Sequence, residues 1–120
     1  MSEDKRKPAI LILLNSNLDE EILTEVLHGI EEEGIPFRIK KDTLNNPFNL
    51  AYQAALESNL SVGIGCSNNE LILTQRSIPQ NNCIMKIKIT DSNEHKRSFG
   101  VNSARLVKGN AFKDLELMEV

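Results

Sequence analysis

The feature that most constrains the fold is the apolar run Ala-Ile-Leu-Ile-Leu-Leu at positions 9–14. A strand with one buried face alternates apolar and polar residues, whereas a strand buried on both faces is apolar throughout. The run is much shorter than the ~20 residues that a transmembrane helix requires. Asn and Ser residues, which favour turns, follow it directly. The run therefore predicts an inner strand of a sheet that other elements cover on both faces.

A helical pattern follows this strand and predicts a helix over about residues 19–33. Its apolar residues recur at helical spacing and form one stripe: Ile22, Leu23, Val26, Leu27 and Ile30. Acidic residues fill the first turn, where the helix dipole favours negative charge. Gly34 suits a left-handed cap, and Pro36 prevents the helix from continuing.

The rest of the chain alternates between further strands and helices. Strands are predicted at residues 36–40, 60–66, 70–74 and 83–89, and helices at 50–58 and 91–108. Residues 43–49 are expected to form a loop, and Gly63 and Gly65 to interrupt a strand. Asp91 with Glu94 resembles a capping box, and Gly100 is expected to bring the last helix close to the sheet. This order predicts an α/β domain with a mixed or mostly parallel sheet of about four to five strands and helices on its faces.

The length of 120 residues predicts a single domain over residues 1–120, with flexible ends at 1–8 and 113–120. A net charge of −3 is poorly suited to nucleic acid or to an anionic membrane surface, so neither is an expected partner. The run at 9–14 is short for a signal peptide, and no small-residue cleavage site follows it. We therefore expect a cytoplasmic protein whose two cysteines, Cys66 and Cys83, are free thiols.

No familiar catalytic motif is complete in the sequence, so no catalytic or cofactor-binding residue is predicted. The Gly-Ile-Gly segment at 63–65 follows a predicted strand, but Asn68 stands where a dinucleotide fingerprint needs its third glycine. A small nucleotide-using enzyme is one interpretation of this segment, and close approach of another backbone is the other. His28 and His95 belong to no metal-binding pattern, and the spacing of the cysteines does not suit zinc.

The run of three glutamates at positions 31–33 lies in the last turn of the first predicted helix. Each carboxylate there is disfavoured by about 0.3–1 kcal/mol, because it faces the negative end of the helix dipole. At about 100° per residue, Glu32 falls nearly opposite the apolar stripe, beside His28 and Glu25. One carboxylate is a poor magnesium site alone, but it can contribute to a site shared between two chains. This geometry predicts that Glu32 faces a partner, with a solvated acidic face as the alternative.

Basic residues gather toward the last predicted helix. They are His95, Lys96, Arg97, Arg105, Lys108 and Lys113. Cations near the C-terminal end of a helix are favourable in themselves, and most surface charges contribute little. The alternative is a docking patch for an acidic partner.

Three stretches carry a family resemblance. They are Gly-Ile-Glu-Glu-Glu-Gly-Ile-Pro-Phe at 29–37, Val-Gly-Ile-Gly at 62–65, and Asp-Ser at 91–92 together with Asn-Ser-Ala-Arg-Leu-Val-Lys-Gly at 102–109. In this order and at these distances they resemble the small subunit of the diol/glycerol dehydratase reactivating factor, over about residues 9–112. The basic N-terminus and the charged tail depart from the family.

The resemblance implies a fold similar to the medium (β) subunit of the dehydratase and a non-catalytic role. In this family a large subunit binds and hydrolyses ATP, and the factor rescues adenosylcobalamin-dependent diol or glycerol dehydratase. The small subunit exchanges with the dehydratase subunit it resembles, and damaged cofactor is released. The resemblance also implies that Glu32 reaches a magnesium ion held mainly by the large subunit. The chain itself is expected to bind no cofactor alone, and association with a bacterial microcompartment is left open.

The predicted interface combines the helix geometry with these motifs. It comprises Glu25, His28, Glu31, Glu32, Arg105 and Lys108. Its expected partners are the large subunit and the dehydratase subunits, and a homo-oligomer can form when the partner is absent. The alternative functions for the chain are a medium-subunit-like component of the dehydratase and a stand-alone homo-oligomeric adaptor. The sequence contains no Asp-x-His-x-x-Gly motif, which argues against a cobalamin-binding domain.

Overall fold

The structure, a computed structural model, describes residues 8–109. Its strands are β1 (Ile10–Asn15), β2 (Phe37–Asp42), β3 (Val62–Ser67), β4 (Glu70–Gln75) and β5 (Met85–Lys88). Its helices are α1 (Thr24–Glu32), preceded by the 3₁₀ turn η2 (Glu20–Leu23), α2 (Pro47–Glu57) and α3 (Asn93–Lys108). Of the ends expected to be flexible, all but Pro8 lie outside the described residues. No helix in residues 8–109 is long and apolar enough to cross a membrane.

The five strands form one sheet in the order β2-β1-β3-β4-β5. β1 pairs in parallel with β2 and with β3, as two strand–helix–strand crossovers require. β4 and β5 are added by antiparallel pairing. The prediction of a mixed sheet of four to five strands is thus confirmed.

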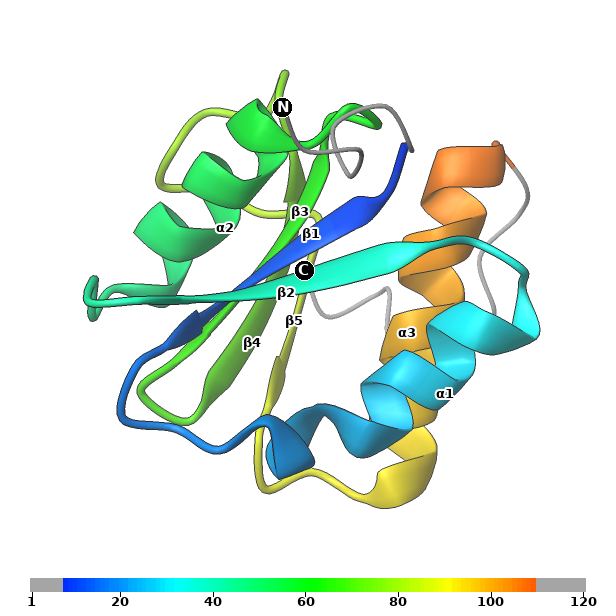
Figure 1. Cartoon of the computed structure of the whole chain (residues 1–120), viewed down its shortest axis with the longest axis horizontal. Coiled ribbons are helices and arrows are strands. Elements are labelled where there is room, and N and C mark those ends of the chain that lie inside the picture. Colours follow the sequence, from blue (N-terminus) through cyan, green and yellow to red (C-terminus); the bar gives the residue numbers. More distant parts are fainter. Residues whose placement is uncertain (1–7, 110–120) are drawn as a thin grey trace.

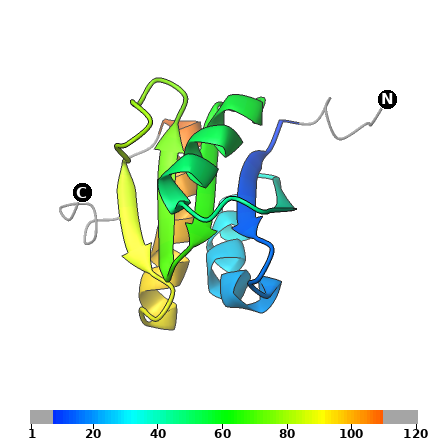
Figure 2. The same cartoon turned by 90° about the vertical axis from the view of Figure 1, so that its left-hand side faces the viewer.

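Helices cover both faces of the sheet, and β1 is buried on both of its faces as predicted. In Figure 1, α2 lies on the left of the sheet and α1 and α3 on the right; Figure 2, seen from the left, shows α2 in front. Ile10, Ile12 and Leu14 belong to the larger core, together with residues of α1 and α3. Leu11 and Leu13 point the other way and pack with Leu50 of α2. The alternation of strand side chains between two covered faces explains the unbroken apolar run.

Gly63 and Gly65 do not interrupt β3, because the strand runs through both of them. A Cβ at Gly63 would lie 2.2 Å from the backbone nitrogen of Ala55, and one at Gly65 would lie 2.3 Å from that of Ala51. Both of these neighbours belong to α2. The glycines therefore allow α2 to approach the sheet closely, which is the second of the two interpretations of this segment.

A second close approach joins α1 to α3. A Cβ at Gly100 would lie 2.0 Å from the carbonyl oxygen of Val26, and one at Gly29 would lie 2.2 Å from that of Arg97. The expectation that Gly100 brings α3 close to the sheet is therefore wrong. The glycines allow the two helix backbones to meet, so α1 and α3 pack side by side on one face.

Three helix starts differ from the sequence prediction. The first helix was predicted from about residue 19, but residues 20–23 form the 3₁₀ turn η2, which Asp19 caps, and α1 itself begins at Thr24. Side-chain caps decide the other two starts. α2 begins at Pro47 rather than residue 50: the Asn46 side chain accepts hydrogen bonds from the next backbone N–H groups, and proline suits the first helical position. α3 is capped by Ser92, whose hydroxyl accepts from the backbone N–H of His95. Asp91 instead lies 3.3 Å from the His95 ring.

Candidate functional site

The predicted residues of the first helix come together on the outer side of the α1–α3 pair. Glu31, Glu32 and His28 are exposed, and Glu25 is half-buried between the two helices. A shallow depression of about 380 Å³ lies among His28, Glu31, Glu32 and Arg97 of α3. The structure therefore combines the acidic face of α1 with a basic residue that was not in the predicted interface.

Arg97 connects two of the acidic residues of α1. Its Nε and Nη2 donate to Oε1 of Glu25 at 3.1 and 2.8 Å, and its Nη1 lies 3.4 Å from Oε2 of Glu32. The Arg97 guanidinium lowers the pKa of the Glu25 carboxyl, mainly through these hydrogen bonds. The sequence placed Arg97 among the basic residues near the last helix, but no local sequence pattern indicates which carboxylates it would contact.

Glu32 is the most accessible of these charged partners, with half of its side chain exposed. The residues 8–109 contain no group of three or more His, Cys, Asp or Glu side chains that could hold a metal ion. A magnesium ion at Glu32 would therefore need its remaining oxygen ligands from another chain, nucleotide or water. The donor chemistry of Glu32 suits such a shared site, and Arg97 is a nearby cation that would compete for it.

Glu33 explains how the acidic end of α1 is tolerated. Its side chain is only 15% exposed, lies 2.8 Å from Nζ of Lys108, and lies 3.4 Å from Nη2 of Arg105. Lys108 also donates to the backbone carbonyl of Glu33 at 3.2 Å. These cations of α3 offset the negative end of the α1 dipole. Arg105 and Lys108 thus make ion pairs within the chain, and their role at an interface stays a prediction.

These ion pairs predict a loss of stability in acid. Hydrogen bonding to Lys108 lowers the pKa of Glu33 below its ordinary value, so Glu33 stabilises the fold above its unfolded pKa of about 4.5. That contribution is lost as the pH falls through the lowered folded pKa. We expect the urea midpoint of the wild type to fall more steeply below pH 4.5 than that of Glu33→Gln. Parallel pH profiles for the two proteins would show that the Glu33 cluster does not stabilise the fold.

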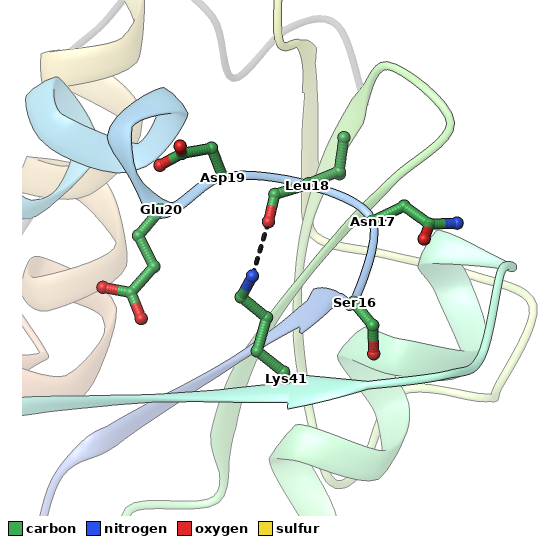
Figure 3. A pocket seen from close by; sticks show the side chains of 6 residues that line it. All are labelled: Ser16, Asn17, Leu18, Asp19, Glu20 and Lys41. Atoms are coloured by element: carbon green, nitrogen blue, oxygen red, sulfur yellow. Dashed lines mark hydrogen bonds between the residues drawn. The ribbon is translucent and has the colours of Figure 1, made fainter.

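A second depression lies at the carboxyl ends of β1 and β2 (Figure 3). Its lining residues are Ser16, Asn17, Leu18, Asp19, Glu20 and Lys41. Lys41 Nζ donates to the backbone carbonyl of Leu18 at 2.7 Å, and the Asp19 side chain points away from it (Figure 3). The Asp19 carboxylate instead caps η2 by accepting from the Glu21 backbone N–H. This depression is therefore a hydrogen-bonded loop junction without converging catalytic groups.

The chain's own loop closes the edge between β1 and β3, where doubly wound sheets bind ligands. Asn15 Nδ2 donates to the carbonyl of Leu44 at 2.7 Å, and the side chains of Ser67 and Asn68 donate to the carbonyl of Asn45. With the backbone of α2 against both glycines of β3, the segment 63–65 has no space for a phosphate. The nucleotide-binding interpretation of these glycines is not supported.

The two thiols do not suggest a nucleophile. Cys66 is buried beneath α1 and α3, and burial raises the pKa of its thiol to about 12. Burial also raises the pKa of Cys83. Because the thiolate is the reactive form, both cysteines are poor nucleophiles at neutral pH.

The chain resembles known proteins over nearly all of its length. Residues 7–113 match the family model described as dehydratase medium subunit. The propanediol dehydratase-reactivating factor small subunit of Citrobacter freundii is 37% identical over 114 residues, which cover 95% of this chain and 97% of that protein. A chain of the diol dehydratase-reactivating factor complexed with ADP and Mg²⁺ superposes with a TM-score of 0.84 at 38% identity, over 89% of this chain and 98% of that one.

A second similar solved structure is a glycerol dehydratase reactivase. A chain of a glycerol dehydratase reactivase superposes with a TM-score of 0.85 at 26% identity, over 89% of this chain and 97% of that one. The family-model match over residues 7–113 includes all the strands and helices described above. The fold prediction and the family resemblance are both confirmed. The chain belongs to the dehydratase medium subunit family and, within it, to the small subunits of dehydratase-reactivating factors.

Proposed function

We propose that this chain is the non-catalytic small subunit of an ATP-dependent reactivating factor for adenosylcobalamin-dependent diol or glycerol dehydratase. The observation that carries the proposal is the match to a chain of the diol dehydratase-reactivating factor, at 38% identity over 98% of that chain. Coverage of nearly the full length of the relatives favours a reactivase small subunit over a component of the dehydratase itself. ATP hydrolysis is assigned to the large subunit, and the complex to the cytoplasm or a bacterial microcompartment within it.

Subunit exchange supplies the mechanism in this proposal. The family model is described as dehydratase medium subunit, so one fold serves both the dehydratase and the reactivating factor. A chain of this shape can replace the medium subunit in a damaged enzyme and open the cofactor site. Such a role requires a docking surface of suitable shape and charge. The α1–α3 surface, formed by Glu25, His28, Glu31, Glu32 and Arg97, offers one.

Glu32 is the proposed contact to a magnesium ion shared with the large subunit. Its side chain is half exposed, and its position on the outer side of α1 leaves space for ligands from another chain. The Glu25–Arg97 pair holds the neighbouring surface in place. Magnesium would join the two chains by binding oxygen ligands from both, and Glu32 would supply one of those ligands.

Co-purification with the large subunit tests the proposal. We expect Glu32→Ala to weaken the complex by roughly tenfold in magnesium and to have little effect when magnesium is chelated, because one metal ligand is lost. Glu20→Ala is the matched control, since Glu20 is an exposed carboxylate on η2 that lines the other depression, with Ser16 and Lys41. The affinities can be measured by titration calorimetry.

The other outcomes separate the parts of the proposal. A complex that is indifferent to Glu32 would keep the family role and reject the shared metal. Failure of the wild-type chain to form any complex, together with stable self-association, would favour a homo-oligomeric adaptor. Restored dehydratase turnover in the presence of ATP, which requires both subunits, would support the reactivating role.

A further inference from the structure

An apolar stripe runs from the flank of α2 to its outer side, on the opposite face of the sheet from α1 and α3. Phe48, Tyr52 and Leu56 recur at every fourth position, so they follow one line along the helix. Phe48 and Tyr52 are half-buried, and Leu56 is 39% exposed. Leu44, just before the helix, is 40% exposed. Among residues 8–109, Leu44 and Leu56 are the large apolar side chains that solvent reaches most.

This stripe is unusual for a helix that faces solvent. Such helices normally carry charged or other polar residues on their outer side. On α2 the polar residues Asn49 and Gln53 lie beside the stripe. α2 carries one charged residue, Glu57, and Lys40 of β2 pairs with it at 3.1 Å. Few charges beside aromatic and aliphatic residues are typical of the central part of a protein interface.

Cations border both ends of the stripe. Lys86 of β5 places Nζ 6.0 Å from the centre of the Phe48 ring, and Arg76 donates from Nη2 to the carbonyl of Leu56 at 2.7 Å. These contacts hold the two positive charges beside the apolar residues, and Lys86 also lies 3.9 Å from the Glu70 carboxylate. The result is an apolar centre with a basic border, which fits the opposite arrangement on a partner.

A cleft extends the stripe at its Phe48 end. Its volume is about 470 Å³, and it lies between α2 and the segment that connects β4 to β5. Its lining residues are Phe48, Ile78, Pro79, Asn81, Asn82, Cys83 and Lys86. Gln80 Nε2 donates to Asn49 Oδ1 at 2.8 Å and ties this segment to the helix. The cleft can receive one apolar side chain from a bound segment.

We propose that the α2 stripe docks an amphipathic helix of another protein, whose apolar row covers Phe48, Tyr52 and Leu56 and whose flanking residues are acidic. A second copy of this chain fits less well, because a two-fold contact would bring the Arg76 and Lys86 borders of both copies together. α2 and the α1–α3 pair cover opposite faces of the sheet (Figures 1 and 2), so both surfaces can be occupied at once. The small subunit would then connect two proteins.

The test uses the whole chain and two helical probe peptides. The first carries leucines at every fourth position with glutamates on both flanks, and the second replaces each glutamate by lysine. We expect the acidic peptide to bind about tenfold more tightly at low salt, because Arg76 and Lys86 attract its glutamates and repel the lysines of the other peptide. Amide NMR shifts should change at residues 44–57 and 76–86. The doubly reversed variant Arg76→Glu/Lys86→Glu should prefer the basic peptide, and Leu56→Gln should weaken both.

Three results with the peptides would overturn the proposal. They are equal binding of the two peptides, no binding of the acidic peptide, and shift changes centred on α1 and α3. Self-association of the wild type that Leu56→Gln abolishes would show that a second copy covers the stripe instead. Circular dichroism of each variant checks that the fold is retained. The test needs neither the large subunit nor magnesium, so its outcome is independent of the function proposed above.

Discussion

Replacing Gly100 by alanine is expected to lower the free energy of unfolding by about 3 kcal/mol, the upper end of the usual overpacking range. The added methyl group would lie 2.0 Å from the carbonyl oxygen of Val26 and 3.1 Å from the backbone nitrogen of Ile30. Both atoms belong to the backbone of α1, so no rotamer change can relieve the clash. In a free helix the same substitution would stabilise by about 1 kcal/mol. The sign of the change therefore reports the contact between α1 and α3.

Urea unfolding followed by circular dichroism measures this effect. Gly34→Ala is a useful control: Gly34 has a φ of 74° and no atom within 4 Å of an added Cβ. Its cost should be about 1–2 kcal/mol, from left-handed backbone strain alone. Gly29→Ala should resemble Gly100→Ala, and the two should not be additive because they act on one helix crossing. An unchanged or higher midpoint for Gly100→Ala would show that the helices can separate at little cost.

The crossing also determines the candidate site. Arg97 precedes Gly100 by one turn of α3 and reaches Glu25 and Glu32 across the contact. Displacement of α3 would lengthen both ion pairs. Under conditions where Gly100→Ala is still folded, we therefore expect weaker binding to the large subunit than for the wild type.

A second large effect is expected for Gly65→Ala in β3. Its Cβ would lie 2.3 Å from the backbone nitrogen of Ala51 and 2.4 Å from the carbonyl oxygen of Pro47. To relieve this overlap α2 must move away from the sheet, at a cost of about 3 kcal/mol. Ala51→Gly should not rescue the variant, because the clash involves backbone atoms. Thermal unfolding of the single and double variants gives the comparison.

The same variant distinguishes the two interpretations of the Gly-Ile-Gly segment. If the glycines serve packing only, ADP leaves the melting temperature of the isolated wild-type chain unchanged. A ligand that binds the native state raises it, by an amount that grows with concentration. A rise with ADP that Gly65→Ala removes would restore the nucleotide-binding interpretation and contradict the structure's assignment of these glycines.

The sequence determined the elements of this fold because each has a local signature. An unbroken apolar run predicted that β1 is buried on both faces, and helical spacing predicted the stripe of α1. Helical spacing also predicted that Glu32 faces outward, and the structure exposes half of its side chain. Boundaries were less certain because caps are single residues: Asn46 begins α2 earlier than its apolar pattern suggested.

The tertiary structure decided which distant residues meet. Arg97 lies 65 positions from Glu32 and Lys108 lies 75 from Glu33, so no local pattern indicates these pairs. They form because Gly29 and Gly100 let two helix backbones touch, and periodicity alone does not show whether a small residue faces a helix, a sheet or solvent. The apolar stripe of α2 became visible in the same way, once the structure showed which side of the helix the sheet covers. Periodicity reports the covered side of each element, whereas side-chain pairing and surface composition depend on how the elements pack.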